Sequence, residues 1–338
     1  MSRLISTTLL LVLPLIALAH ESPGYSHRSE AGTSNPRWMT ALRDDTKLSE
    51  LSIPGTHDTM AFYGGDIVQT QSMSLEAQLR GGIRVLDIRC RRIENTFAIH
   101  HGPVFQKVFF GDVLNTVIRF LSENPGETVL MRVKEEHTAE RNSETFEETF
   151  SRRYWIPHQS SFWQPSSNNP TLGEIRGRIV VLQNFKADAK YGIDYGSIKT
   201  QDKYRVSDNW ALYDKWVEVR RHLNDADTGD ANMTFMNYLS GSGGSFPYFV
   251  ASGHSSKGTG APRLATGLTT PGWKDKYPDF PRVDCVIGIC TIAFEGTNVL
   301  AYQRIGKKYT RRVGMVMADF PGPGLIERVI HLNDRFRR

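Results

Sequence analysis

The stretch Ile83-Arg84-Val85-Leu86-Asp87-Ile88-Arg89 decides the fold, because its apolar and charged side chains alternate with the period of a β-strand. Leu86 and Ile88 share one face of this strand, and Asp87 and Arg89 share the other. The first face is expected to pack on helices. A carboxylate and a guanidinium on an inward face are costly unless they pair with each other or serve a ligand. The stretch therefore predicts a core strand that carries either a structural ion pair or part of a functional site.

Strands and helices alternate on both sides of this stretch. The expected strands are 48–53, 83–89, 97–101, 128–133, 178–182, 233–238 and 313–318, and the expected helices are 74–79, 113–121, 210–223 and a last one from residue 325. This alternation over about 300 residues favours a mainly parallel α/β sheet closed into an eight-stranded barrel. A doubly wound open sheet is the alternative.

Ionisable residues gather where the expected strands end. They are His57 and Asp58, Asp87 and Arg89, His101, Lys134, and Asp319. In a barrel, the carboxyl ends of the strands meet at one mouth, and chemistry is concentrated there. The pattern therefore favours the barrel over the open sheet.

The chain begins with an apolar run over residues 9–19 that ends in Ala17-Leu18-Ala19. The run is shorter than the roughly 20 residues that a bilayer core requires, and it contains Pro14. It predicts a secretory signal peptide over residues 1–19, with a transmembrane anchor as the alternative. We therefore expect a secreted, extracellular protein.

Composition indicates a globular chain, since 39% hydrophobic and 23% charged residues among 338 provide enough apolar material for a large core. Residues 20–37 show no periodicity and predict a flexible leader, so a single domain is expected to span residues 38–338. The net charge of +5 favours anionic surfaces such as acidic lipid head groups. Nucleic acid is not expected as a partner, because no Lys/Arg stripe is interleaved with aromatic residues.

Three cysteines allow at most one internal disulfide in a secreted chain. Cys285 and Cys290 lie close in sequence and are the expected pair, which leaves Cys90 as a buried thiol. The alternative of three reduced core residues stays open, because residues 285–290 also have the pattern of an apolar strand.

Two histidines follow expected strands at sharp turns. His57 lies in Ser52-Ile53-Pro54-Gly55-Thr56-His57-Asp58, and His101 lies in Ile99-His100-His101-Gly102-Pro103. A lone histidine is more often structural than catalytic, but two at the mouth of one barrel suggest a base that takes a proton and an acid that gives one. Cleavage of a phosphodiester by internal attack of a hydroxyl needs such a pair.

The chain resembles the X domain of phosphatidylinositol-specific phospholipases C, in particular the compact bacterial type. The stretches that carry the resemblance are 53–59, 81–89, 100–103 and 124–134. Pro-Gly-Thr-His-Asp, Asp-Ile-Arg and His-His-Gly-Pro are far more specific together than singly, and the resemblance covers residues 38 to about 204 and returns at 314–319. It implies a distorted, incomplete (β/α)8 TIM barrel. It also implies a reaction that releases diacylglycerol and forms inositol 1,2-cyclic phosphate.

The resemblance implies catalytic roles for particular residues. His57 is the expected base for the inositol 2-hydroxyl, oriented by Asp319. His101 is the expected acid that protonates the diacylglycerol oxygen, with Asp58 beside it. Arg89 matches the arginine that contacts the phosphate and stands where calcium-dependent relatives hold their metal, so no metal or other cofactor is expected.

Four more residues receive roles from the resemblance. Asp87 matches a carboxylate that supports the catalytic cluster. Lys134, Asp202 and Tyr204 match positions that contact the inositol ring or stack on it. Without the resemblance, Lys134 and Asp202 would be assigned to surface charge and Tyr204 to core packing.

The sequence departs from the bacterial pattern in two respects. The inositol-binding arginine after the fifth strand is absent, and only Asn184 or Lys186 is available there for substrate binding. The rim segments that carry tryptophan in the bacterial enzymes are short and Trp-free at 61–71 and rich in Gly and Ser at 240–246. A loop-rich insertion at about 252–284 is either a replacement membrane rim or a long surface loop.

The sequence therefore predicts a secreted, monomeric phosphodiesterase that acts on phosphatidylinositol or its glycosylated forms at a membrane surface. Two other functions stay open. A related barrel phosphodiesterase for another head group would need carboxylates gathered around a divalent ion, whereas here an arginine lies among them. A non-catalytic inositol- or glycan-binding protein would be signalled by loss of a histidine, and neither histidine is lost.

Overall fold

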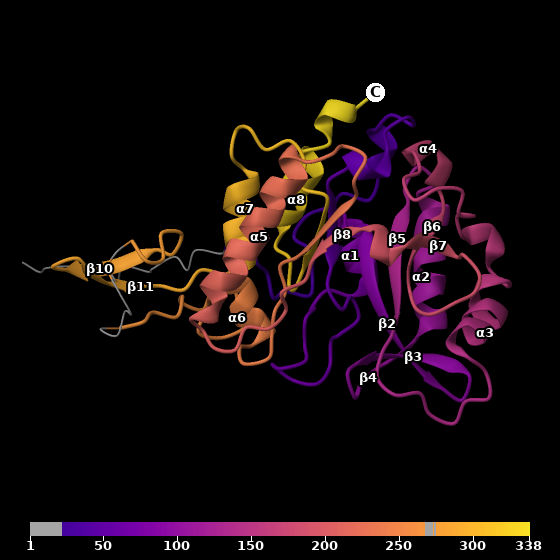
Figure 1. The fold of residues 1–338 in the computed structure, drawn as a ribbon, viewed down its shortest axis with the longest axis horizontal. Helices are drawn as coiled ribbons and strands as arrows, with labels where there is room; N and C mark the ends of the chain where they lie inside the picture. Colours follow the sequence, from indigo (N-terminus) through magenta and orange to yellow (C-terminus); the bar gives the residue numbers. More distant parts are fainter. Residues whose placement is uncertain (1–21, 268–272, 274) are drawn as a thin grey trace, which may run out of the picture.

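The computed structural model describes residues 22–267, 273 and 275–338 (Figure 1). The expected signal peptide, residues 1–19, lies outside the described residues. Parallel strands form a curved sheet in the order β7-β6-β5-β2-β1-β12-β9-β8. Their bounds are β1 Ile53–Thr56, β2 Val85–Ile93, β5 Val129–Glu135, β6 Ile179–Asn184, β7 Gly192–Asp194, β8 Lys199–Gln201, β9 Phe235–Tyr238 and β12 Met315–Ala318.

The strand order confirms an incomplete barrel. Each parallel strand except β8 lies beside its predecessor in the chain, and the last, β12, pairs with the first, β1. A doubly wound sheet would instead reverse its order at a switch point. Within the described ranges no ladder joins β7 to β8, and the short turn Tyr195–Ser197 lies between them. The fold is therefore the distorted, incomplete (β/α)8 barrel that the sequence predicted.

Helices cover the outside of the sheet. Their bounds are α1 Leu75–Gly81, α2 Phe110–Glu123, α3 Phe146–Phe150, α4 Leu172–Ile175, α5 Ala211–Thr228, α6 Pro247–Ser252, α7 Thr297–Ile305 and α8 Pro323–His331. The last four lie together on one side of the barrel (Figure 1). The four expected helices are confirmed as α1, α2, α5 and α8. At α1, the Ser74 hydroxyl accepts the N–H of Ala77, and Gly82 ends the helix with φ of 120°.

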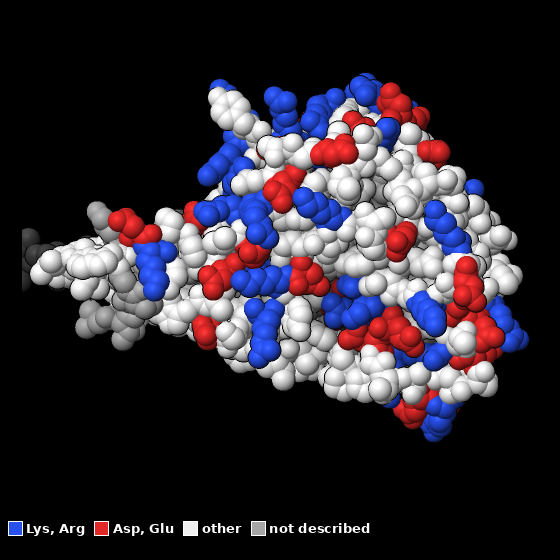
Figure 2. All heavy atoms as spheres, in the orientation of Figure 1, with Lys and Arg blue, Asp and Glu red and all other residues white. Residues whose placement is uncertain are grey.

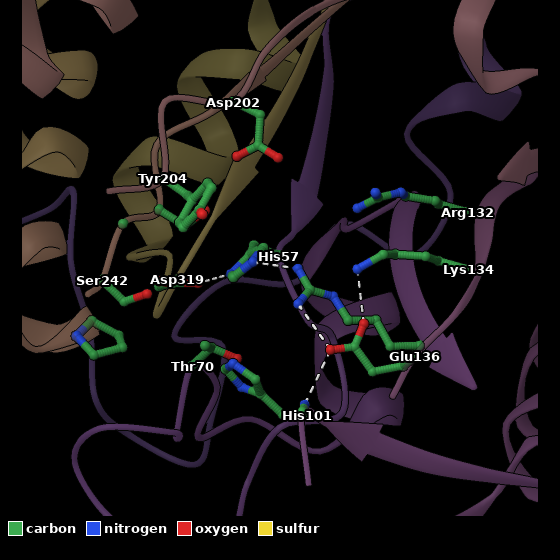
Figure 3. A pocket seen from close by; sticks show the side chains of 15 residues that line it. His57, Thr70, His101, Arg132, Lys134, Glu136, Asp202, Tyr204, Ser242 and Asp319 are labelled. Carbon is green, nitrogen blue, oxygen red and sulfur yellow. Dashed lines mark hydrogen bonds and ion pairs between the residues drawn. The ribbon is translucent and has the colours of Figure 1, made fainter. Parts of the chain in front are cut away.

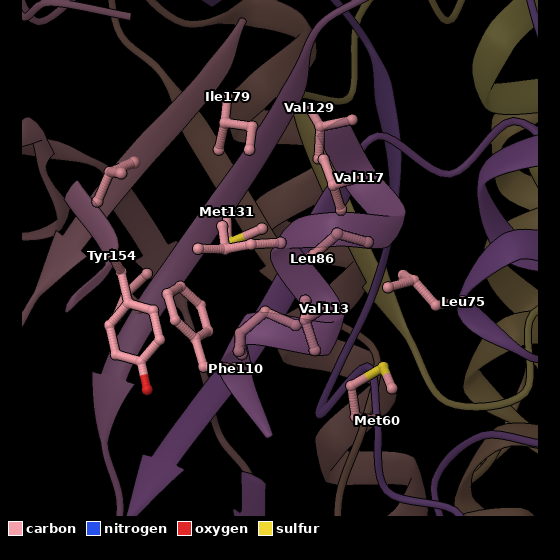
Figure 4. Close-up of a cluster of buried hydrophobic side chains, with 14 of the residues drawn as sticks. Met60, Leu75, Leu86, Phe110, Val113, Val117, Val129, Met131, Tyr154 and Ile179 are labelled. Carbon is pink, nitrogen blue, oxygen red and sulfur yellow. The ribbon is translucent and has the colours of Figure 1, made fainter. Parts of the chain in front are cut away.

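The two faces of β2 separate as the alternation predicted. Leu86 and Met131 meet Val113 and Val117 of α2 in the layer between sheet and helices (Figure 4). Val85 points the other way, into the cluster that fills the barrel interior. The inward face at the carboxyl end of β2 is thus left for charged side chains.

Two expected strands are corrected. Of the expected strand 48–53 only Ile53 is in a strand, because the Glu50 carboxylate accepts the N–H of Lys47 and closes a turn, so β1 begins at Ile53. β3 (Thr96–His101) is not a barrel strand, since it pairs antiparallel with β2.

A hairpin therefore extends β2 beyond the barrel. Glu94 and Asn95 have φ of 50° and 56°, the conformation of a two-residue turn between antiparallel strands. β4 (Val104–Phe109) pairs antiparallel with β3 and completes the extension. His101 thus reaches the mouth of the barrel from a hairpin and not from the end of a parallel strand.

The expected flexible leader is also corrected, because residues 22–37 pack against the barrel. Tyr25 is 1% exposed and lies in the core formed with α7 and α8. The carbonyls of Asn35 and Pro36 accept hydrogen bonds from the Arg84 guanidinium. The segment has no regular secondary structure but is ordered by these long-range contacts. Such contacts leave no periodicity in the sequence, so the sequence did not predict this packing.

The insertion leads into a second hairpin that the sequence did not predict. Strands β10 (Arg282–Val286) and β11 (Ile289–Ile292) pair antiparallel, and a disulfide joins Cys285 to Cys290, the expected pair. Cys90 is a free, buried thiol. Figure 1 shows the hairpin projecting away from the barrel beyond α5 and α7. None of the described helices is both long and apolar enough to cross a membrane.

A fully buried ion pair holds the amino-terminal end of β2. The Arg84 guanidinium contacts the Glu127 carboxylate at 2.9 Å, and both side chains have no exposed surface. Arg84 also donates to the carbonyls of Leu79 and Ile83, and Glu127 accepts the backbone N–H groups of residues 39 and 40. Four separate segments are therefore joined through one pair of charges.

Glu127→Ala is expected to lower the free energy of unfolding by about 3–5 kcal/mol, because it leaves the Arg84 charge buried without a partner. Denaturant unfolding followed by circular dichroism measures the change. Asp45→Ala is the control, since Asp45 forms an exposed pair with Arg43 and its loss should cost about 0–1 kcal/mol. Equal losses in the two variants would contradict a structural role for the buried pair.

Candidate active site

A pocket of about 490 Å³ opens at the carboxyl ends of the barrel strands (Figure 3). Its lining comes from segments spread over most of the chain: His57, Thr70, Arg89, His101, Gly102, Arg132, Lys134, Glu136, Asp202, Tyr204, Ser240, Gly241, Ser242, Pro247 and Asp319. Seven of the ten residues expected at the site line it: His57, Arg89, His101, Lys134, Asp202, Tyr204 and Asp319.

Strand register explains why distant residues meet here. Thr56 at the end of β1 is paired with Ala318 at the end of β12, so the residues that follow, His57 and Asp319, leave the sheet side by side. Arg89 on β2 is likewise paired with Lys134 on β5. The sheet itself therefore sets the spacing of these four side chains.

His57 is held between an acceptor and a donor. Its Nδ1 lies 2.8 Å from Oδ1 of Asp319, and its Nε2 lies 2.7 Å from Nη2 of Arg89. Because a guanidinium only donates, Nε2 must accept, and the ring proton is therefore on Nδ1 and donated to Asp319. Burial, with help from the Arg89 charge, lowers the pKa of His57 well below its ordinary value. The ring is thus neutral, with its basic nitrogen toward the pocket.

Arg89 lies among three carboxylates. Its Nη2 is 3.2 Å from Asp87, and its Nη1 is 3.4 Å from Asp58 and 3.9 Å from Glu136. Burial alone would lower the pKa of the guanidinium, but these carboxylates outweigh burial and raise its pKa. Arg89 therefore stays charged although only 13% of its side chain is exposed.

The buried carboxylates are held in different states. Burial would raise the pKa of Asp87, but Arg89 and Arg132 outweigh it and hold the pKa below its ordinary value. Asp58 is shielded less by cations, and burial raises its pKa to about 6. Burial and the nearby Asp58 charge also raise the pKa of Asp319. Asp87 is therefore the permanent anion of the cluster.

His101 faces the same pocket from the β3–β4 hairpin. Its Nδ1 lies 3.1 Å from Oδ2 of Asp58, so this carboxylate stands between His101 and Arg89. The neighbouring His100 points to the other face of the strand, where its ring lies 5.6 Å from the ring of Phe105. The structure thus brings His101, and not His100, to the pocket.

Two turns at the mouth have unusual backbone geometry. Asp58 follows His57 with φ of 40°, and Phe320 follows Asp319 with φ of 46°. Residues other than glycine seldom adopt this left-handed conformation, and where they do it is often at functional sites. The Asp58 N–H donates to Asp87, which fixes the first of these turns.

Further polar groups, here called the polar wall, line the rest of the pocket. Lys134 Nζ contacts Glu136 at 2.8 Å, and Asp202 and the exposed Tyr204 lie across the pocket from these two residues (Figure 3). Glu136 also accepts the N–H of Gly102, which ties the turn after His101 to the end of β5. These groups suit a ligand that carries many hydroxyls.

Asn184 does not reach the pocket, which corrects its expected role in substrate binding. Its side-chain oxygen accepts two hydrogen bonds from Arg132, at 2.9 and 2.7 Å, and so supports that residue from behind. Arg132 lines the pocket, contacts Asp87 at 3.1 Å and stacks on the ring of Tyr195. The pocket therefore contains a second guanidinium besides that of Arg89.

Sequence reasoning missed Arg132 and Glu136. Arg132 lies on the face of β5 that Lys134 occupies, and Glu136 continues the same two-residue spacing directly after the strand. The same period-two argument that identified Asp87 and Arg89 would have found them. Thr70 and Ser242 were also missed, and they lie in irregular loops where no period operates.

Among the described residues no group of three or more histidine, cysteine or acidic side chains is arranged to hold a metal ion. The acidic groups of the mouth instead surround Arg89, whose guanidinium provides the positive charge there. A guanidinium matches paired phosphate oxygens in geometry as well as in charge. The arrangement can therefore hold a phosphodiester between a base and an acid.

Comparisons with known proteins agree with this geometry. A family model described as phosphatidylinositol-specific phospholipase C, X domain, matches residues 45–185. The 1-phosphatidylinositol phosphodiesterase of Listeria monocytogenes is 32% identical over 248 residues, which cover 67% of this chain and 75% of that protein. That of Staphylococcus aureus is also 32% identical, over 65% of this chain and 80% of its own length.

Solved structures show the same architecture. The phosphatidylinositol-specific phospholipase C of Listeria monocytogenes superposes with a TM-score of 0.62 at 27% identity and covers 89% of this chain and 99% of its own. A Staphylococcus aureus enzyme gives a TM-score of 0.66 at 24% identity, with coverage of 90% and 99%, which bears on the fold alone. The chain belongs to the family of phosphatidylinositol-specific phospholipases C.

Proposed function

We propose that this protein is a phosphatidylinositol phosphodiesterase that uses His57 as base and His101 as acid. The observation that carries the proposal is the state of His57, a neutral imidazole whose Nδ1 proton is committed to Asp319. Its Nε2 is therefore the nitrogen that can accept a proton from a substrate. His101 lies across the Arg89 cluster and faces the same pocket.

In the first half of the reaction the inositol 2-hydroxyl attacks the phosphorus. His57 Nε2 takes the hydroxyl proton as the new P–O bond forms. In the protein without substrate this nitrogen accepts from Arg89. A substrate phosphate competes for the guanidinium with its own oxygens, so its binding turns Arg89 to the phosphate and releases the base.

In the second half the bond between phosphorus and the glycerol oxygen breaks. His101 gives its proton to that oxygen, so diacylglycerol leaves as a neutral alcohol and inositol 1,2-cyclic phosphate remains. The Asp58 carboxylate lies 3.1 Å from Nδ1 of His101 and orients its ring for this transfer. Each histidine ends in the protonation state from which the other began, and the balance of protons is complete.

Substrate selection belongs to the polar wall. We assign inositol contacts to Arg132, Lys134 and Asp202, with Tyr204 available to stack on the ring. Tyr204 is largely exposed, so the pocket stays open to solvent on this side. This openness suits phosphatidylinositol and also leaves room for its glycosylated forms.

Location and assembly are part of the proposal. The amino-terminal apolar run supports secretion, and the Cys285–Cys290 disulfide is typical of an oxidising compartment. The pocket is complete within one chain, which supports a monomer as the active unit.

The leaving group tests the two roles. His57→Ala and His101→Ala are each expected to lose several orders of magnitude on phosphatidylinositol. On a nitrophenyl ester of inositol phosphate, His101→Ala should recover most of its rate, because a good leaving group needs little protonation. His57→Ala should not recover, since the 2-hydroxyl must still be deprotonated.

The matched control for the histidine variants is His100→Ala, whose side chain faces away from the pocket and which should keep most of the activity. Circular dichroism checks that each variant is folded. Recovery of His57→Ala on the ester, with His101→Ala inert, would require the two roles to be exchanged.

Chelators are expected to leave the activity intact. Arg89 supplies the charge that faces the phosphate, and its surrounding carboxylates are already paired with it. The measurement is the rate on phosphatidylinositol with excess EDTA and again after added calcium. Loss of activity with EDTA and its return with calcium would contradict the role of Arg89.

The pH dependence follows from His57. The base must be neutral, and burial with Arg89 lowers its pKa below the ordinary 6.5, so kcat/KM should fall only at pH values below 6.5. The profile is measured on a water-soluble substrate. Asp58 also titrates near pH 6, so the profile is repeated with Asp58→Asn, in which the fall should persist. An acid limb with its midpoint above 6.5 would contradict the assignment.

A further inference from the structure

The β10–β11 hairpin carries an unusual concentration of exposed apolar side chains. Ile287 is 90% exposed, Val286 63%, Trp273 62% and Ile289 51%. The eight residues from Cys285 to Ile292 include no ionisable side chain other than the disulfide-bonded cysteines. Figure 2 shows the end of this projection free of the charged groups that are scattered over the barrel. Elsewhere Phe105 and Phe109 form a less exposed pair, 39% and 46% exposed, with their ring centroids 5.6 Å apart.

The turn at the tip of the hairpin has a backbone conformation that is unfavourable for the isoleucine it contains. Val286 pairs with Ile289, so Ile287 and Gly288 form a two-residue turn with φ of 50° and 80°. Such turns favour Asn-Gly, and a β-branched residue at positive φ is a rare outlier. The most exposed position of the hairpin is thus occupied by an isoleucine that its backbone disfavours.

The hairpin is braced from below. The disulfide joins the two strands one residue pair beneath Val286 and Ile289, and the ring of Trp273 lies against Gly288. At its base, Arg282 donates to the carbonyls of Tyr277 and Phe280. The apolar tip is therefore presented on a stiff support.

The support itself is docked on α5. Phe280 is buried there, with its ring 5.1 Å from that of Tyr213, and the Asp279 carboxylate accepts from Trp216 and Arg220. The hairpin is thus continuous with the folded barrel and not a loose loop.

We propose that this tip inserts into the interfacial region of a lipid bilayer and anchors the enzyme on the surface that holds its substrate. The inference rests on the proposed function for the identity of that surface. A bilayer suits this narrow tip, which has no charged side chain from residue 285 to 292 and is flanked by Trp273, because a few apolar side chains suffice for interfacial insertion. A stable protein interface needs roughly 20 residues on each side, far more than this tip offers.

Ile287→Asn tests the proposal without damage to the hairpin, because asparagine tolerates positive φ better than isoleucine. Binding is measured by co-sedimentation with phosphatidylcholine vesicles that contain no phosphatidylinositol. We expect about tenfold weaker binding for Ile287→Asn, in line with the burial of one large aliphatic side chain, and unchanged or higher thermal stability. Ile156→Asn is the matched control, an exposed isoleucine directly after the helical turn Ser151–Trp155, and it should bind as the unmodified protein does.

The controls separate this inference from the proposed function. Ile287→Asn should cleave the soluble nitrophenyl ester of inositol phosphate at the normal rate, since the residue is not part of the pocket. Unchanged vesicle binding, or an equal loss in Ile156→Asn, would overturn the anchor. The anchor would also be overturned if the unmodified protein sediments as a dimer and Ile287→Asn as a monomer while vesicle binding is unchanged. The tip would then be a contact between two copies of the protein. If neither protein cleaves any inositol phosphodiester but Ile287→Asn still binds vesicles tenfold more weakly, the anchor stands and the proposed function fails.

Discussion

The contact between Arg89 and its three carboxylates is the constraint on which the mouth of the barrel depends. Asp58, Asp87 and Glu136 would repel one another strongly in a buried volume if no cation lay between them. With Arg89 in place, the same groups form a rigid frame that also fixes His57 through its Nε2. Catalytic geometry and local stability are therefore consequences of one guanidinium.

The frame also gives the two histidines of the pocket different surroundings. His57 is kept neutral beside Arg89, whereas His101 is set against Asp58. Two chemically identical imidazoles thus lie beside groups of opposite charge, the Arg89 guanidinium and the Asp58 carboxylate. The difference arises from strand order, because β12 brings a carboxylate to His57 and the turn after β1 brings another to His101.

Much of this arrangement follows from local sequence. The period-two alternation of residues 83–89 identified β2, its two faces and the charged pair at its end, and the Ser74 cap and Gly82 fixed α1. The family resemblance supplied the roles of His57 and His101, which spacing alone left open between structure and catalysis.

What could not be predicted depends on contacts between distant segments. The packing of residues 22–37, the buried Arg84–Glu127 pair and the support of Arg132 by Asn184 each join parts of the chain whose own patterns are ordinary. The antiparallel course of β3 was missed for a different reason. The residue types of Glu94 and Asn95 do not distinguish a tight hairpin turn from a longer loop. Only the positive φ of both residues identifies the turn.

The pairing of β1 with β12 has a consequence for how the chain folds. Ile53 lies opposite Met315, so the first strand of the barrel pairs with a strand some 260 residues later in the chain. Contacts of such high sequence separation slow folding, since the loop between them must close first. During synthesis the amino-terminal half would therefore remain without its final neighbour until the carboxyl end has emerged. Completion of the barrel is thus a late event, and a chain truncated before β12 would expose the edge of β1 to aggregation.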